Sequence, residues 1–159
     1  MRNTERYNKS LVGDVALQTL ARPRGTMARK TLAGRLILIA EDEVLISMDI
    51  ENTFKDAGAR VRICSTVEDA LVVAENRDLS AAVVNHVLHD GESSPLCERL
   101  KQRGIPFVLF SGFRNVKGAC RTGVQVHKPT NSLILVSTVA RLLRPPLTLV
   151  PKLQTSQAL

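Results

Sequence analysis

The 159-residue sequence predicts an α/β fold, a doubly wound parallel sheet of five strands that is preceded by a basic N-terminal arm. Three observations predict it. Short, continuous aliphatic runs are typical of strands that are buried on both faces. Stretches with helical apolar spacing alternate with these runs from residue 35 onward. Such alternation requires crossover connections, which give a mostly parallel sheet covered by helices on both faces.

The first half of the predicted domain clearly shows both the aliphatic runs of strands and the apolar spacing of a helix. The five expected strands are residues 36–40, 61–64, 81–84, 106–110 and 124–127. Between the first two, Ile46, Ile50, Phe54 and Ala57 recur at helical steps and predict an amphipathic helix. Gly58 follows this stripe, and a glycine in that position commonly ends a helix in the left-handed conformation.

The later helices are marked by capping residues. Ser65 and Glu68 have the spacing of a capping box, which predicts a helix start. A helix near 94–103 is expected to end at Gly104, and a turn is expected at Asp90–Gly91. Thr130 or Asn131 is expected to cap the last helix. That helix is expected to turn four apolar residues toward the core, namely Leu133, Val136, Val139 and Leu143.

Composition limits the class of protein. No apolar run approaches the roughly 18–20 residues of a membrane-spanning helix, so we expect no membrane insertion. Cys64, Cys97 and Cys120 are widely spaced and odd in number, with no metal-binding pattern. We therefore expect three core thiols rather than a disulfide, in the reducing cytoplasm.

The net charge of +7 is concentrated at the N-terminus. Residues 1–35 carry eight basic and two acidic side chains, and the rest of the chain is nearly neutral. We expect residues 1–34 to form a disordered arm, 35–144 a domain and 145–159 a tail. Met27 is an alternative start of the native protein. The arm could contact phosphates, which leaves a nucleic-acid-associated protein as a competing function, although we do not favour it.

Polar side chains follow the predicted strands at one edge of the sheet, where ligands bind in such folds. Glu41 and Asp42 follow the first strand, Asn85 the third, Ser111 the fourth and Lys128 the fifth. Two adjacent carboxylates suit Mg²⁺, and a hydroxyl with an ammonium suits a phosphoryl oxygen.

Residues 35–144 resemble the receiver domain of two-component response regulators. The resemblance rests on Leu-Ile-Leu-Ile-Ala-Glu-Asp-Glu at 36–43, the stretch 81–91, Phe-Ser-Gly at 110–112 and His-Lys-Pro at 127–129. It implies the flavodoxin-like strand order 2-1-3-4-5. It also implies that Glu41, Asp42 and the backbone carbonyl of Val87 hold Mg²⁺, that Ser111 bonds the phosphoryl group, and that Lys128 neutralises its charge.

Asn85 departs from this pattern, because it occupies the position of the aspartate that receivers phosphorylate. A carboxamide is a very poor nucleophile and cannot form the acyl phosphate. It also removes one negative charge, so we expect at most a weak Mg²⁺ site. Gln125 stands where receivers often carry an aromatic switch residue, and the interval from Ser111 to Lys128 is short, so the fourth helix is expected to be reduced.

The sequence thus predicts a stand-alone, non-enzymatic pseudo-receiver of bacterial type without an output domain. We expect it to act in a phosphorelay by binding a histidine kinase or another relay protein without being phosphorylated. A conventional Mg²⁺-dependent phospho-receiver is the alternative, and a homodimer is left open. A metal cluster of His86, His89 and Asp90 is a weaker hypothesis, since no distant ligand accompanies it.

Overall fold

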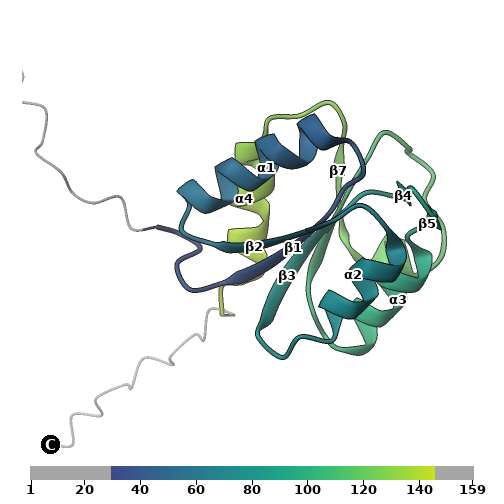
Figure 1. The fold of residues 1–159 in the computed structure, drawn as a ribbon, viewed down its shortest axis with the longest axis horizontal. Helices are drawn as coiled ribbons and strands as arrows, with labels where there is room; N and C mark the ends of the chain where they lie inside the picture. Colours follow the sequence, from purple (N-terminus) through teal and green to yellow (C-terminus); the bar gives the residue numbers. More distant parts are fainter. Residues whose placement is uncertain (1–29, 146–159) are drawn as a thin grey trace, which may run out of the picture.

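A five-stranded parallel sheet forms the centre of the molecule (Figure 1). The computed structural model describes residues 30–145. The strands of this sheet are β1 (Leu36–Ala40), β2 (Arg60–Cys64), β3 (Leu79–Val84), β6 (Phe107–Ser111) and β7 (Val124–His127). Their order across the sheet is β2-β1-β3-β6-β7, which confirms the doubly wound topology. A separate two-stranded ribbon consists of β4 (Val87–Leu88) and β5 (Gly91–Glu92).

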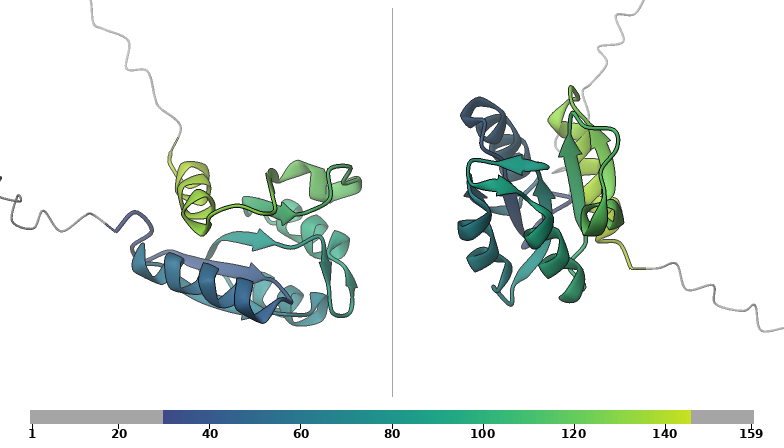
Figure 2. Two further views of the ribbon diagram at one scale, coloured as in Figure 1. Left: turned by 90° about the horizontal axis from the view of Figure 1, so that it is seen from above. Right: turned by 90° about the vertical axis from the view of Figure 1, so that its right-hand side faces the viewer.

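Helices cover both faces of the sheet (Figure 2). The helices α1 (Val44–Asp56) and α4 (Ser132–Leu142) pack on one face, and α2 (Val67–Ala74) and α3 (Ser94–Gln102) pack on the other. Ile37 and Ile39 of β1 point to the first core, and Leu38 and Ala40 point to the second. The central strands are buried on both faces because each residue of the alternating pleat meets a helix layer.

The apolar stripe of α1 is confirmed by burial. Ile50 and Phe54 are buried, and Ile46 and Ala57 pack partly against the same core. After the helix, Gly58 has a φ of +91°, and a Cβ there would lie 2.6 Å from the Cβ of Lys30. Glycine is therefore required at this turn for both its conformation and its small size.

The expected burial of the last helix is wrong at one position. Val136 and Val139 are buried, but Leu133 is 63% exposed, and Leu135 fills the core instead. Leu133 lies in the first turn, where its amide hydrogen donates to the side chain of the N-cap Asn131. The cap is thus one of the two residues that we predicted.

The N-terminal boundary of the domain lies earlier in the sequence than we predicted. Leu32, assigned above to the arm, is 1% exposed and belongs to the core between the sheet, α1 and α4. Its amide donates to the carbonyl of Ala57 at 3.0 Å, which ties the segment to the end of α1. Residues 1–29, most of the predicted arm, lie outside the described residues, as do 146–159 of the predicted tail.

The start of α2 differs from the predicted capping box by one residue. Thr66, not Ser65, is the N-cap, and its hydroxyl accepts from the amide of Asp69. Asp90 supplies a second acceptor, because its carboxylate accepts hydrogen bonds from the amides of Val67 at 2.6 Å and Glu68 at 3.1 Å. Asp90 therefore does more than form a turn, because it caps a helix that begins 23 residues earlier.

Asp90→Asn is expected to lower the melting temperature at neutral pH, since the amide offers one acceptor oxygen where the carboxylate offers two. The Val67 amide, above all, holds the pKa of Asp90 below its ordinary value of 3.8. A lowered pKa contributes stability that is present above 3.8 and is lost as the pH falls through the folded value. Thermal melts at pH 7 and pH 3 should show a smaller acid-induced loss for the variant than for the native chain. Equal losses would contradict the capping role.

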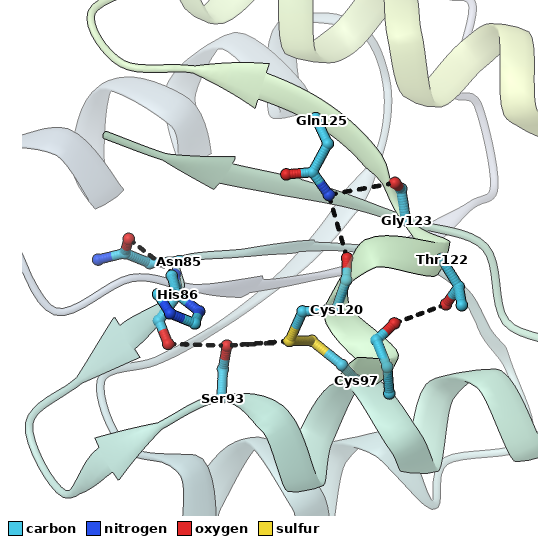
Figure 3. Close-up of a disulfide and its surroundings, with 9 residues drawn as sticks. Asn85, His86, Ser93, Cys97, Cys120, Thr122, Gly123 and Gln125 are labelled. Carbon is cyan, nitrogen blue, oxygen red and sulfur yellow. Dashed lines mark hydrogen bonds between the residues drawn. A yellow bond between two sulfur atoms is a disulfide. The ribbon is translucent and has the colours of Figure 1, made fainter. Parts of the chain in front are cut away.

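The segment between β6 and β7 carries the shortened element that we predicted. The alternation of strands and helices along the chain calls for a full helix here, but the chain forms a 3₁₀ helix, η1 (Gly118–Thr122). Gln125, which follows it on β7, donates from Nε2 to the carbonyls of Cys120 at 3.1 Å and Gly123 at 3.4 Å (Figure 3). Its side chain is thus bound to the loop that precedes its own strand.

The expectation of three free thiols is wrong. Cys97 of α3 and Cys120 of η1 form a buried disulfide, and both side chains are fully excluded from solvent (Figure 3). Within residues 30–145, Cys64 is the remaining thiol, and burial raises its pKa to about 11. The bridge removes the observation on which a reducing compartment was predicted, because disulfides are rare in the cytosol. The cytoplasmic location therefore stays a prediction.

The double variant Cys97→Ser, Cys120→Ser is expected to lose about 3 kcal/mol of unfolding free energy, from the entropy of closing a loop with a sequence separation of 23. Urea denaturation without reductant measures it. A thiol titration provides the control: the native chain should show one reactive thiol when denatured, and none when folded. Three thiols in the denatured chain would contradict the bridge.

Candidate functional site

Four of the predicted site residues meet at one edge of the sheet. Glu41 and Asp42 follow β1, Asn85 follows β3, and Lys128 follows β7. The neighbouring pairs Ala40↔Val84 and Ser111↔His127 bring these strand ends level, and the amide of Asn85 donates to the carbonyl of Ala40 at 2.8 Å. This is the edge that the parallel topology selects for function.

The Asn85 side chain is bound directly to the acidic pair. Its Nδ2 donates to Oε1 of Glu41 at 3.2 Å and to Oδ1 of Asp42 at 3.0 Å. Its Oδ1 accepts from the backbone amide of His86 at 2.9 Å. This orientation follows from chemistry, because carboxylates only accept and a backbone N–H only donates. All three bonds would be lost if the amide were turned over.

Glu41 forms a buried ion pair with Lys128. Glu41 is 2% exposed, and its Oε2 accepts from Nζ of Lys128 at 2.8 Å. Burial raises the pKa of Glu41 above its ordinary value of 4.5, and the hydrogen bonds from Lys128 and from the Glu43 amide oppose this effect. The Nζ atom also lies 5.0 Å from the centre of the Phe110 ring and 3.5 Å from the exposed carboxylate of Glu43. Lys128 is therefore the main counter-charge of the site.

The donor set does not fit Mg²⁺ in this arrangement. Mg²⁺ needs oxygen ligands in near-octahedral geometry. Asn85 turns N–H groups, not an oxygen, toward Glu41 and Asp42, and Lys128 already neutralises one carboxylate. Within residues 30–145, no group of three or more His, Cys, Asp or Glu side chains is placed to hold a metal ion. The amide and the ammonium therefore occupy, as hydrogen-bond donors, the side of the acidic pair that a cation would otherwise face.

Ser111 and Val87 lie beside this group without joining its hydrogen bonds. Ser111 is buried at the end of β6, its carbonyl accepts from the Lys128 amide at 3.1 Å, and its Oγ accepts from the Phe113 amide. In this structure the hydroxyl thus stabilises its own turn. Val87 begins the β4–β5 ribbon, and its carbonyl as a metal ligand stays a prediction.

The histidine-rich loop is not a metal cluster. His89 approaches Asp42, with 3.6 Å between Nδ1 and Oδ2, and its side chain is 60% exposed. The carboxylate of Asp90 is instead occupied by the N-terminus of α2. His86 packs edge-on against Phe113, with 5.5 Å between ring centres, and its buried Nδ1 finds no hydrogen-bond partner among residues 30–145. This contact was not predicted, because Phe113 carries no periodic signal.

The disulfide lies next to this loop. Ser93 Oγ donates to the carbonyl of His86 at 3.1 Å and lies 3.8 Å from the sulfur of Cys120 (Figure 3). The backbone after Asn85 is thereby connected to the bridge between α3 and η1. The bridge holds the short element that replaces a full helix, and so it supports the loop from which the site amide projects.

An apolar surface lies beside the site, at the start of α1. Val44, Leu45 and Met48 are 68%, 83% and 51% exposed, and we call these three residues the α1 patch. A pocket of about 310 Å³ between α1 and the β7–α4 loop runs from Leu45 to Lys128 and Pro129, which are joined by a cis peptide bond. Exposed apolar side chains that are grouped together and bordered by polar residues are typical of protein-binding surfaces.

Solved receiver domains share this fold. A CheY-like response regulator receiver domain from Methanospirillum hungatei JF-1 matches with a TM-score of 0.62 and 23% identity, covering 69% of this chain and 93% of that one. A response regulator receiver protein from Sinorhizobium medicae WSM419 gives a TM-score of 0.61 and 22% identity, covering 69% and 94%.

A third structure was solved with a metal. The receiver domain of a sensor histidine kinase from Pseudomonas aeruginosa PAO1, with a magnesium ion coordinated in its active site cleft, has a TM-score of 0.62 and 19% identity. It covers 70% of this chain and 98% of its own. No protein-family model and no curated protein matches the sequence. At these identities the likeness establishes the receiver fold. None of the helices described is long and apolar enough to cross a membrane.

Proposed function

We propose that this chain is a non-enzymatic, receiver-like protein of phosphorelay signalling that binds a histidine kinase or another relay protein without being phosphorylated. The observation that carries the proposal is the amide of Asn85, which donates to both Glu41 and Asp42. A receiver needs a nucleophilic carboxylate oxygen at this point. Here the neighbouring carboxylates are already bonded to N–H groups, and the amide oxygen accepts from His86.

The charges of the site support a fixed shape rather than a switch. Lys128 offsets one of the two negative charges of Glu41 and Asp42, and the Asn85 amide donates hydrogen bonds to both carboxylates. A switch requires an element whose two states are biased by a change of charge. Because both carboxylates already have hydrogen-bond donors, the protein is expected to present one surface to its partner.

The α1 patch is the part of this surface that we propose contacts the partner. It lies directly after Glu41–Glu43, at the mouth of the site. Its three apolar side chains are exposed, whereas those of the same helix on the opposite side are buried in the core. Burial of such side chains is the usual source of binding free energy.

Incubation with a small-molecule phosphodonor and Mg²⁺ tests the chemistry. The intact mass of the native chain is expected to stay unchanged, because an amide forms no acyl phosphate. Asn85→Asp, treated in the same way, is the matched control for the site. An acid-labile phosphoryl group on the native chain would overturn the proposal and favour a conventional phospho-receiver.

A pull-down from the native cell tests the binding mode. The same kinase or relay protein should be retained by the native chain and by Asn85→Asp. Leu45→Glu with Met48→Glu should lose it, whereas Val72→Glu, at a 71% exposed position on the other face, should keep it. Retention by the Asp form alone would show that binding depends on the acceptor and would contradict the proposal.

A further inference from the structure

A groove runs between α1 and α4, away from the α1 patch. Its volume is about 580 Å³, and we call it the α1–α4 groove. The polar and apolar side chains along it include Lys30, Asp49, Thr53, Asp56, Asn131 and Leu133. The two helices are joined across its floor by Thr53 and Ser132, whose hydroxyl oxygens lie 2.8 Å apart.

The walls of the groove carry two acidic side chains and one basic side chain beside polar and apolar ones. Asp49 and Asp56 are exposed and stand two turns apart on α1, and neither has an ion-pair partner among residues 30–145. Leu133, on the opposite wall, is an apolar side chain that is 63% exposed. An occupant that matches this surface carries positive charge together with apolar side chains.

The chain itself supplies such a segment. Lys30, the first described residue, lines the groove, so residues 1–29 are attached to the chain at a lining residue. Those residues carry six basic and two acidic side chains, a net charge of +4. Leu17 and Leu20 are followed by Arg22 and Arg24, which places apolar and basic groups close together in the sequence.

The distances allow this docking. Arg24 is six residues before Lys30, a reach of at most about 20 Å in extended chain. Asp49 and Asp56 are seven helical residues apart, which is about 10 Å along α1. Because the segment is tethered at the groove, its effective concentration is high, on the order of millimolar, and weak contacts suffice to hold it.

We propose that residues 11–29 bind the α1–α4 groove of their own chain, with Leu17 and Leu20 against Leu133, and with Arg22 and Arg24 near Asp49 and Asp56. The proposal is independent of the phosphorelay function. It requires only the shape and charge of the groove, and the composition and attachment point of the segment.

The variant Leu17→Trp in the full chain gives a direct probe, because the native sequence has no tryptophan. Docking should give a blue-shifted indole emission that acrylamide quenches poorly, and both properties should be independent of protein concentration. Adding Asp49→Lys and Asp56→Lys should reduce the ratio of docked to undocked chain on the order of tenfold, since each exposed ion pair shifts an equilibrium up to roughly fivefold. The emission should then move to the red, and quenching should increase.

Glu68→Lys with Glu98→Lys is the matched control, because it changes the net charge equally on α2 and α3, across the sheet. It should leave the emission of the position-17 indole unchanged, and circular dichroism should show that both charge variants are folded. An indole that is fully accessible before any charge is reversed would overturn the proposal. So would equal effects of the two charge variants, or a blue shift that disappears on dilution, which would indicate docking onto a second copy.

Discussion

Lys128→Met is expected to lower the free energy of unfolding by about 3–5 kcal/mol at pH 7, the range for removing one partner of a buried ion pair. Glu41 is 2% exposed, and Lys128 is its charged partner at 2.8 Å. Methionine retains most of the apolar stem but removes the Nζ atom that faces the Phe110 ring and leaves the carboxylate without its counter-charge. The loss is therefore electrostatic rather than a loss of packing.

The pH dependence of this variant identifies the cause. Burial already raises the pKa of Glu41, and removal of Lys128 takes away the first of the interactions that lower it. A carboxyl group whose pKa is raised by folding contributes stability that is fully present below its ordinary pKa of 4.5. This contribution is lost as the pH rises through the pKa of the folded state. The stability deficit of Lys128→Met should therefore shrink as the pH is lowered toward 4.5.

Urea denaturation of Lys128→Met at pH 7 and pH 5 measures both effects. Lys101→Met is the matched control, because Lys101 is an exposed residue of α3 outside the ion pairs of the described residues. It should change stability by about 0.5 kcal/mol or less at either pH. A second control, Glu41→Gln added to Lys128→Met, should recover part of the loss by removing the unpaired charge. A deficit that is independent of pH would show that Glu41 is not responsible.

Asn85→Asp is expected to lower the unfolding free energy by about 2–3 kcal/mol in the absence of a divalent cation. The change removes two hydrogen bonds to charged acceptors, each of which contributes about 1.5–3 kcal/mol, and part of this is recovered by water. It also places a third carboxylate beside Glu41 and Asp42, and like charges at this distance repel. Mg²⁺ should restore about 1.4 kcal/mol at ten times its dissociation constant.

Thermal melts with and without Mg²⁺ test this prediction, with Ala at position 85 as the comparison. Asn85→Ala loses the same two hydrogen bonds but adds no charge, so its melting temperature should respond to Mg²⁺ less than that of Asn85→Asp. The native chain should respond little, because the Asn85 amide already donates to both carboxylates. A large Mg²⁺-induced rise in the melting temperature of the native chain would show that Mg²⁺ displaces the Asn85 amide from the carboxylates.

Features that depend on one stretch of sequence were predictable. The sheet followed from runs such as Leu36–Ala40, because a strand covered on both faces must be apolar throughout. Glu41, Asp42, Asn85 and Lys128 could be brought together without coordinates, since parallel strands end at a common edge. The resemblance to receivers gave the strand order, which local pattern alone does not contain.

Features that depend on distant segments were missed. The Cys97–Cys120 bridge needs α3 and η1 to be adjacent, and the spacing of two cysteines carries no such information. The cap from Asp90 to α2 and the burial of Leu32 arise in the same way, from contacts across the fold. The detailed bonds of Asn85 required the positions of three acceptors and donors, although its neutral charge was evident from the sequence.

The hydrogen bonds of Gln125 to the carbonyls of Cys120 and Gly123 have a consequence for variants that carry an acid at position 85. In a signalling domain that switches, a change at the reactive site is transmitted because a nearby side chain is free to move. Here the Gln125 side chain is hydrogen-bonded to a loop that the Cys97–Cys120 disulfide joins to α3. We therefore expect that a variant with an acid at position 85 that accepts a phosphoryl group would gain mass without changing the shape of its surface.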